Sequence, residues 1–106
     1  VEKWQGTLYF GTDSGLEAAN YNQSRITNQL IEALHGVRIR CLMSDSENNL
    51  WICTSGKGVW EVAPNGNIEK YDSENGTLGD KFRSAIEITD GTIAAAGDYG
   101  KIMCGM

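Results

Sequence analysis

The chain has 106 residues, enough to bury one ordinary hydrophobic core, and it carries a formal net charge of −5. This acidic balance and the lack of a dense Lys/Arg cluster argue against nucleic acid as a partner. No apolar run approaches the roughly 20 residues of a membrane-spanning helix, and no signal-peptide pattern opens the chain. Membrane contact by this segment is therefore not expected.

The same short sequence pattern occurs three times along the chain. Residues 6–16 read GTLYFGTDSGL, residues 49–59 read NLWICTSGKGV, and residues 91–102 read the weaker GTIAAAGDYGKI. The copies are 42 and then 43 positions apart, measured at Leu8, Leu50 and Ile93. A fixed period in the low forties with several short strands per unit is typical of a β-propeller. The predicted fold is all-β, a partial propeller of about two and a half four-stranded antiparallel blades.

The first unit, residues 1–36, is expected to be a partial blade without its innermost strand. Strands are predicted at 8–12 and 16–19, and the repeat offset places an outer strand near 25–29. Apolar residues in that region also recur at helical spacing: Ile26, Leu30, Ile31 and Leu34. We therefore expect a short strand over 24–27 and then a helical turn over 30–34, which His35-Gly36 would end.

The second unit, residues 37–80, reads as a complete blade. Its strands are expected at 39–43, 50–54, 59–62 and 68–72. Polar turns join these strands, and the Asn65-Gly66 turn tolerates the positive φ angles that tight hairpins need.

The third unit, residues 81–106, is expected to supply an inner and two middle strands but no outer one. Both ends of the chain would then expose unpaired edges or blade faces, which favour pairing with another chain. The expected partners are other propeller blades or further copies of the chain, with a homo-oligomer as the result.

The strands are apolar on both sides, as in Leu50-Trp51-Ile52-Cys53, which predicts burial on both faces of a blade. Trp51 and Trp60 are expected to pack in the core. Three cysteines, Cys41, Cys53 and Cys104, lie in such apolar runs and are expected to be buried thiols. A Cys41–Cys53 bridge is the alternative if the two strands pair in the right register.

Residues 39–54 resemble the two-component regulator propeller repeat, whose pattern is close to V-R-x-I-x-x-D-x-x-G-N-L-W-I-G-T. The sequence here is IRCLMSDSENNLWICT. Asn48 stands where the pattern has Gly, and Cys53 stands where it has the Gly before Thr54. The middle unit carries nearly all of the resemblance, and the flanking units are partial.

The resemblance implies a location and a function. Similar propellers form the extracytoplasmic sensor of bacterial membrane receptors, with a histidine kinase or a diguanylate cyclase as output domain. The expected function is thus non-catalytic sensing or binding of a small molecule or glycan, without a cofactor. A protein-interaction scaffold is the alternative. A propeller enzyme resembling streptogramin lyase, which relies on a His/Glu metal site, is less favoured.

Four residues are candidates for ligand binding. Arg40 and Arg83 occupy equivalent places in the strand that usually lines the channel of a propeller, and guanidinium groups pair well with carboxylates or phosphates. Asp98 and Tyr99 lie in a turn expected on the same face as the loops between blades. The competing interpretations are arginines paired with nearby carboxylates and an ordinary solvated turn.

No catalytic or metal-binding group is predicted. Asp45, Glu47 and Asn49 alternate like the ligands of a calcium loop, but Leu50 and the residues after it do not continue that pattern. No spacing places a nucleophile against His35, the one histidine in the sequence.

Overall fold

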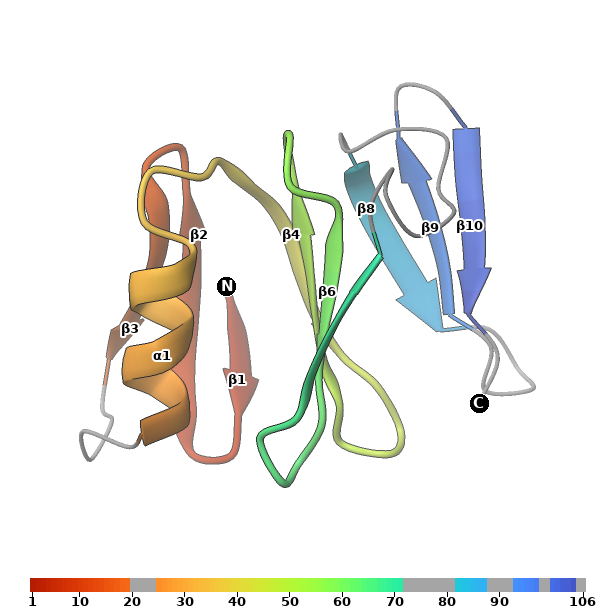
Figure 1. Ribbon diagram of the computed structural model, residues 1–106. Helices are drawn as coiled ribbons and strands as arrows, with labels where there is room; N and C mark the ends of the chain where they lie inside the picture. The colour runs from red at the N-terminus through yellow and green to blue at the C-terminus, as the bar shows by residue number, and fades with distance from the viewer. Residues whose placement is uncertain (20–24, 72–81, 88–92, 98–99, 105–106) are drawn as a thin grey trace.

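The computed structural model describes residues 1–19, 25–71, 82–87, 93–97 and 100–104, with side chains through residue 71 and at Ile93. In these residues three antiparallel sheets stand side by side, with one helix at the first of them (Figure 1). This arrangement confirms the predicted all-β class and the partial propeller. No helix in the described part of the chain is long and apolar enough to cross a membrane.

The first sheet has the order β1-β2-β3, formed by β1 (Glu2–Trp4), β2 (Thr7–Thr12) and β3 (Gly15–Ala19). The expectation that this blade lacks an inner strand was wrong, because β1 pairs antiparallel with β2. Gln5 and Gly6 connect the two strands with φ angles of 49° and 80°. Positive φ at both central residues is what a two-residue hairpin turn requires.

A helix stands where the first blade was expected to have an outer strand. α1 (Arg25–Ala33) includes residues 25–27, so the strand predicted there was wrong; residue 24 lies outside the described residues. Thr27, Leu30 and Leu34 are buried at helical spacing, so one stripe of the helix packs against the core. The chain leaves the helix at Gly36, whose φ of 81° suits a residue without Cβ.

The middle sheet has the order β4-β5-β6-β7. Its strands are β4 (Ile39–Ser44), β5 (Leu50–Thr54), β6 (Val59–Val62) and β7 (Ile68–Tyr71). The last sheet has the order β10-β9-β8, formed by β8 (Phe82–Glu87), β9 (Ile93–Gly97) and β10 (Gly100–Cys104).

Polar contacts of β1 join the first sheet to the middle sheet. The Glu2 carboxylate accepts hydrogen bonds from the backbone N–H of Ser44 at 2.7 Å and from its hydroxyl at 3.2 Å. The Trp4 indole N–H donates to the carbonyl of Asn48 at 2.9 Å, and its ring is buried. β1 therefore fixes the position of the middle blade.

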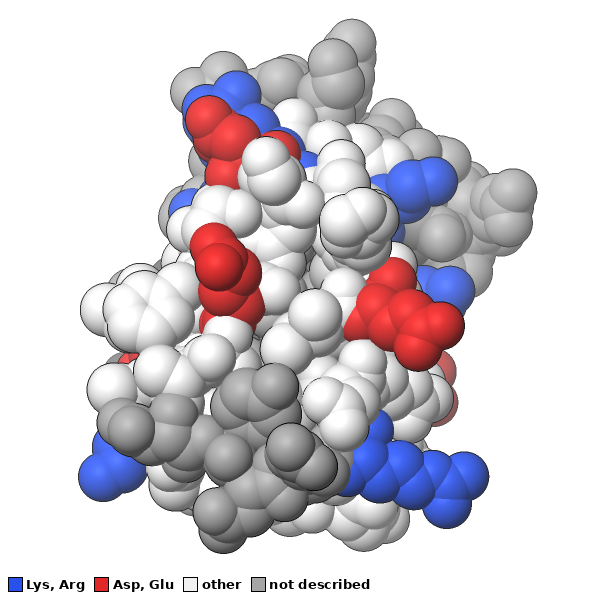
Figure 2. Space-filling model, turned by 90° about the vertical axis from the view of Figure 1, so that its left-hand side faces the viewer, with Lys and Arg blue, Asp and Glu red and all other residues white. Residues whose placement is uncertain are grey.

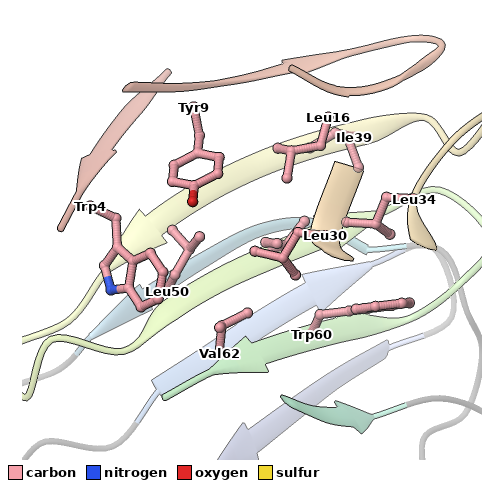
Figure 3. Packing of buried hydrophobic residues seen from close by; sticks show 10 residues of the cluster. Trp4, Tyr9, Leu16, Leu30, Leu34, Ile39, Leu50, Trp60 and Val62 are labelled. Carbon is pink, nitrogen blue, oxygen red and sulfur yellow. The ribbon is translucent and has the colours of Figure 1, made fainter. Parts of the chain in front are cut away.

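Two apolar clusters lie on opposite faces of β5, all five of whose residues are buried. One face packs toward the first sheet and α1 (Figure 3), in a cluster of Trp4, Tyr9, Leu16, Leu30, Leu34, Ile39, Leu50, Ile52, Trp60 and Val62. The other face packs toward the last sheet, in a cluster of Trp51, Cys53, Val59 and Ile93. The predicted burial on both faces is confirmed for this blade, as is core packing of Trp51 and Trp60.

Candidate functional site

The two candidate arginines occupy equivalent β-bulges. Ile39 pairs with Thr54 and Cys41 with Cys53, so Arg40 is the extra residue on β4. Phe82 pairs with Gly97 and Ser84 with Ala96, so Arg83 is the extra residue on β8. A bulge leaves one residue outside the pairing ladder and changes the direction of its side chain.

Arg40 differs from its neighbour Arg38 in its surroundings. The exposed guanidinium of Arg38 forms an ion pair with Asp13, with 2.9 Å between Nε and Oδ1. Arg40 is half-buried and makes no ion pair within the described residues. The side chain of Arg83 lies outside the described part. Thus β4 carries a half-buried arginine whose guanidinium can pair with an external anion.

At one end of the molecule, the β2–β3 turn and the β5–β6 turn both contact the segment that links α1 to β4. The backbone N–H of Gly36 donates to the carbonyl of Ser14 at 2.8 Å. The N–H of Ser55 donates to the carbonyl of Arg38 at 2.9 Å. Asp98 and Tyr99, predicted to lie at this end, are outside the described residues.

A shallow hollow of about 350 Å³ lies at the same end, between the β2–β3 turn and α1. Its lining includes Thr12, Glu17, Ile31 and His35. Within the described residues, no group of three or more His, Cys, Asp or Glu side chains is placed to hold a metal ion. The ionisable side chains that line the hollow are those of Glu17 and His35.

Asp45 is the centre of a buried hydrogen-bond network at the β4–β5 turn. One carboxylate oxygen accepts from the backbone N–H groups of Glu47 and Asn49, both at 2.9 Å. The other accepts from the Asn49 amide at 3.0 Å and from the Trp51 indole N–H at 2.8 Å. Both oxygens are thus occupied by donors of the chain.

The pKa of Asp45 reflects this network. Burial by itself raises the pKa of the carboxyl, but the hydrogen bonds from Trp51, Asn49 and Glu47 outweigh it and hold the pKa below the ordinary 3.8. The residue therefore stabilises the turn as a carboxylate.

Two equivalent threonines close the next turn in the first and middle blades. The Thr54 hydroxyl donates to the carbonyl of Gly58 at 2.7 Å, and the Thr12 hydroxyl donates to that of Gly15 at 2.8 Å. The same hydroxyls accept backbone N–H groups of Lys57 and Ser14. These hydrogen bonds of Thr12 and Thr54 hold the two turns in shape.

Part of the chain matches a known protein family. No curated protein and no solved structure is significantly similar to the chain. Residues 33–56 match the family described as the two component regulator propeller. The matched segment runs from the end of α1 through β4 and β5 and contains Asp45, Asn49, Trp51 and Thr54. Residues 33–56 are therefore similar to a repeat of the two component regulator propeller family.

Proposed function

We propose that the chain is part of a non-catalytic, ligand-binding propeller in the extracytoplasmic sensor of a bacterial membrane receptor. The repeat at 33–56 supports this, because the family is typical of receptor regions. In this proposal the signalling output, a histidine kinase or a diguanylate cyclase, belongs to another part of the receptor.

The observation that carries the proposal is the position of Arg40. A bulge on the inner strand β4 sets apart a half-buried arginine that makes no ion pair within the described residues. Arg83 occupies the equivalent bulge of β8, which contacts β4 and β5. Guanidinium groups bind carboxylates and phosphates through paired, charge-assisted hydrogen bonds, so the proposed ligand is anionic. Its binding would alter how the middle and last blades pack together.

The first prediction tests this site by isothermal titration with inorganic phosphate and with citrate. We expect Arg40→Gln and Arg83→Gln each to weaken binding by about tenfold or more, because each loses a charged hydrogen-bond donor. Arg38→Gln is the matched control, since it removes an exposed arginine two positions away. Equal binding by the wild type and both bulge variants would contradict the proposal, as would the absence of binding to either anion.

Association with another blade is a second proposal, and Phe10 favours it. Phe10 occupies on β2 the place that Ile52 has on β5, 42 positions later. Ile52 is fully buried against the first sheet, whereas Phe10 is 40% exposed. The side of the molecule that shows the first sheet and α1 is largely uncharged near its centre, with separate acidic groups around this area and basic groups toward the edges (Figure 2). We infer that the outward face of the first sheet packs against a further copy of the chain or another blade.

The second prediction follows from this packing. Light scattering of the wild-type chain should show association, and Phe10→Glu should shift it toward the monomer, because a charge cannot be buried cheaply in an apolar contact. Gln29→Glu adds the same charge on the exposed side of α1 and should leave association unchanged. A stable, folded wild-type monomer at high concentration would contradict the proposal.

A further inference from the structure

Two cysteines lie opposite each other on adjacent strands of the middle sheet. Cys41 on β4 and Cys53 on β5 are direct partners in the antiparallel register. Directly opposed residues have Cα atoms about 4.5–5.5 Å apart, within the range of about 4.4–6.8 Å that a disulfide spans. The two residues are not bridged in this structure. The register that a bridge requires is thus already present.

The two thiols differ in their accessibility. Cys53 is fully buried in the cluster that faces the last sheet. Cys41 is half-buried, on the strand at the end of the sheet order. A reagent from solvent therefore reaches Cys41 more readily than Cys53.

The electrostatics of the pair support the same order. A hydrogen bond with Cys41, burial and the charge that Cys41 acquires all raise the pKa of the Cys53 thiol. The Cys53 thiol therefore resists losing its proton. The more accessible Cys41 is thus placed to supply the thiolate, which is the nucleophile of thiol–disulfide exchange.

We propose that Cys41 and Cys53 form a redox-active dithiol that is reversibly oxidised by low-molecular-weight disulfides. The Cys41 thiolate attacks one sulfur of the small disulfide, forming a mixed disulfide and releasing one small thiolate. The Cys53 sulfur then attacks Cys41, forming the protein disulfide and releasing the second small thiolate. The two protein protons end on the two released thiols, so the small disulfide is reduced as the pair is oxidised.

The position of the pair gives its oxidation a local consequence. The bridge would join β4 to β5 at the residue that follows the Arg40 bulge, and it would close the β4–β5 hairpin covalently. Constraining that hairpin in the unfolded chain stabilises the fold. The inference does not rest on the proposed ligand, since it concerns only the two thiols and the register of the strands.

The experiment uses the full 106-residue chain carrying Cys104→Ala, which leaves the opposed pair as its two cysteines. The protein is incubated with oxidised and reduced glutathione at graded ratios, quenched by alkylation, and measured by intact mass and peptide mapping. We expect the loss of two hydrogens with no retained glutathione, and a single Cys41–Cys53 crosslink. The oxidised chain should melt about 5 °C or more above the reduced one.

Two single-cysteine variants separate the steps in the same background. Cys53→Ala should stop at the mixed disulfide and retain one glutathione on Cys41, whereas Cys41→Ala should react at least tenfold more slowly because Cys53 is buried. A lasting glutathione adduct on the chain with both cysteines would overturn the proposal. So would unreactive thiols under oxidising ratios, which wild-type protein tests without any substitution.

Discussion

Asp45→Asn is expected to lower the free energy of unfolding by about 3 kcal/mol, the largest effect of any single polar change in the middle blade. The asparagine oxygen can still accept the backbone N–H groups of Glu47 and Asn49. Its NH₂ group, however, would face the Asn49 amide and the Trp51 indole N–H, which are both donors. Chemical denaturation followed by circular dichroism measures the loss.

The same carboxylate gives this prediction a pH dependence. Its pKa is lower in the folded chain than the ordinary 3.8, so its contribution is complete above that value and is lost as the pH falls through the folded pKa. The difference between the wild type and Asp45→Asn should therefore shrink in acid. Asp13→Asn is the control, because its side chain is 84% exposed and its ion pair contributes little. A constant difference between pH 7 and pH 3 would contradict the assigned role.

Gly11→Ala is expected to destabilise the chain by about 2 kcal/mol through overpacking between the first and middle sheets. A Cβ at Gly11 would lie 2.6 Å from Cγ2 of Ile39, closer than nonbonded carbon atoms approach. Ile39 is buried at the start of β4 and cannot move away without disturbing the apolar cluster. Thermal and chemical unfolding of the variant measure the cost.

A double-mutant cycle isolates this contact. Ile39→Ala should remove most of the cost of Gly11→Ala, since the new methyl group then enters vacated space. Ile39→Val keeps both the Cβ and a γ-methyl group and should retain most of the cost. A coupling of about 1–2 kcal/mol is expected in the first cycle. Additive effects in both backgrounds would show that the methyl group is accommodated elsewhere.

The sequence predicts most of the architecture because the apolar residues of the middle repeat are largely those that the fold buries. Leu50 and Ile52 face one neighbour, and Trp51 and Cys53 face the other, so the run of apolar residues on β5 matches a blade packed on both sides. The turns follow local chemistry equally well. Gly66, in the predicted Asn-Gly turn, has a φ of 95°, and such backbone conformations favour residues without Cβ.

The errors arise where a short segment has two physical interpretations. The three residues of β1 are too few for a strand pattern, and only the Gln5-Gly6 turn signals the hairpin. In α1, the tertiary environment buries Thr27, Leu30 and Leu34 along one stripe, so the helical period prevails over the repeat offset.

The candidate site was predictable only in part. The matching positions of Arg40 and Arg83 are visible in the sequence, but the bulges are not, because a one-residue register shift depends on strand pairing. Asp45 was compared with a calcium ligand because acidic residues alternate there. The sequence could not show that indole, amide and backbone donors occupy both carboxylate oxygens.

The helix at the outer position of the first blade has a consequence for assembly. Among the described residues β3 pairs only with β2, and α1 lies against it instead of a fourth strand. A foreign strand would otherwise find unpaired amide and carbonyl groups along such an edge and extend the sheet. With a helix beside that edge, sideways growth into fibrils is discouraged, while stacking through the outward face stays open. The first blade thus favours the addition of further blades on its outward face, as in a propeller ring, over the addition of strands at its edge.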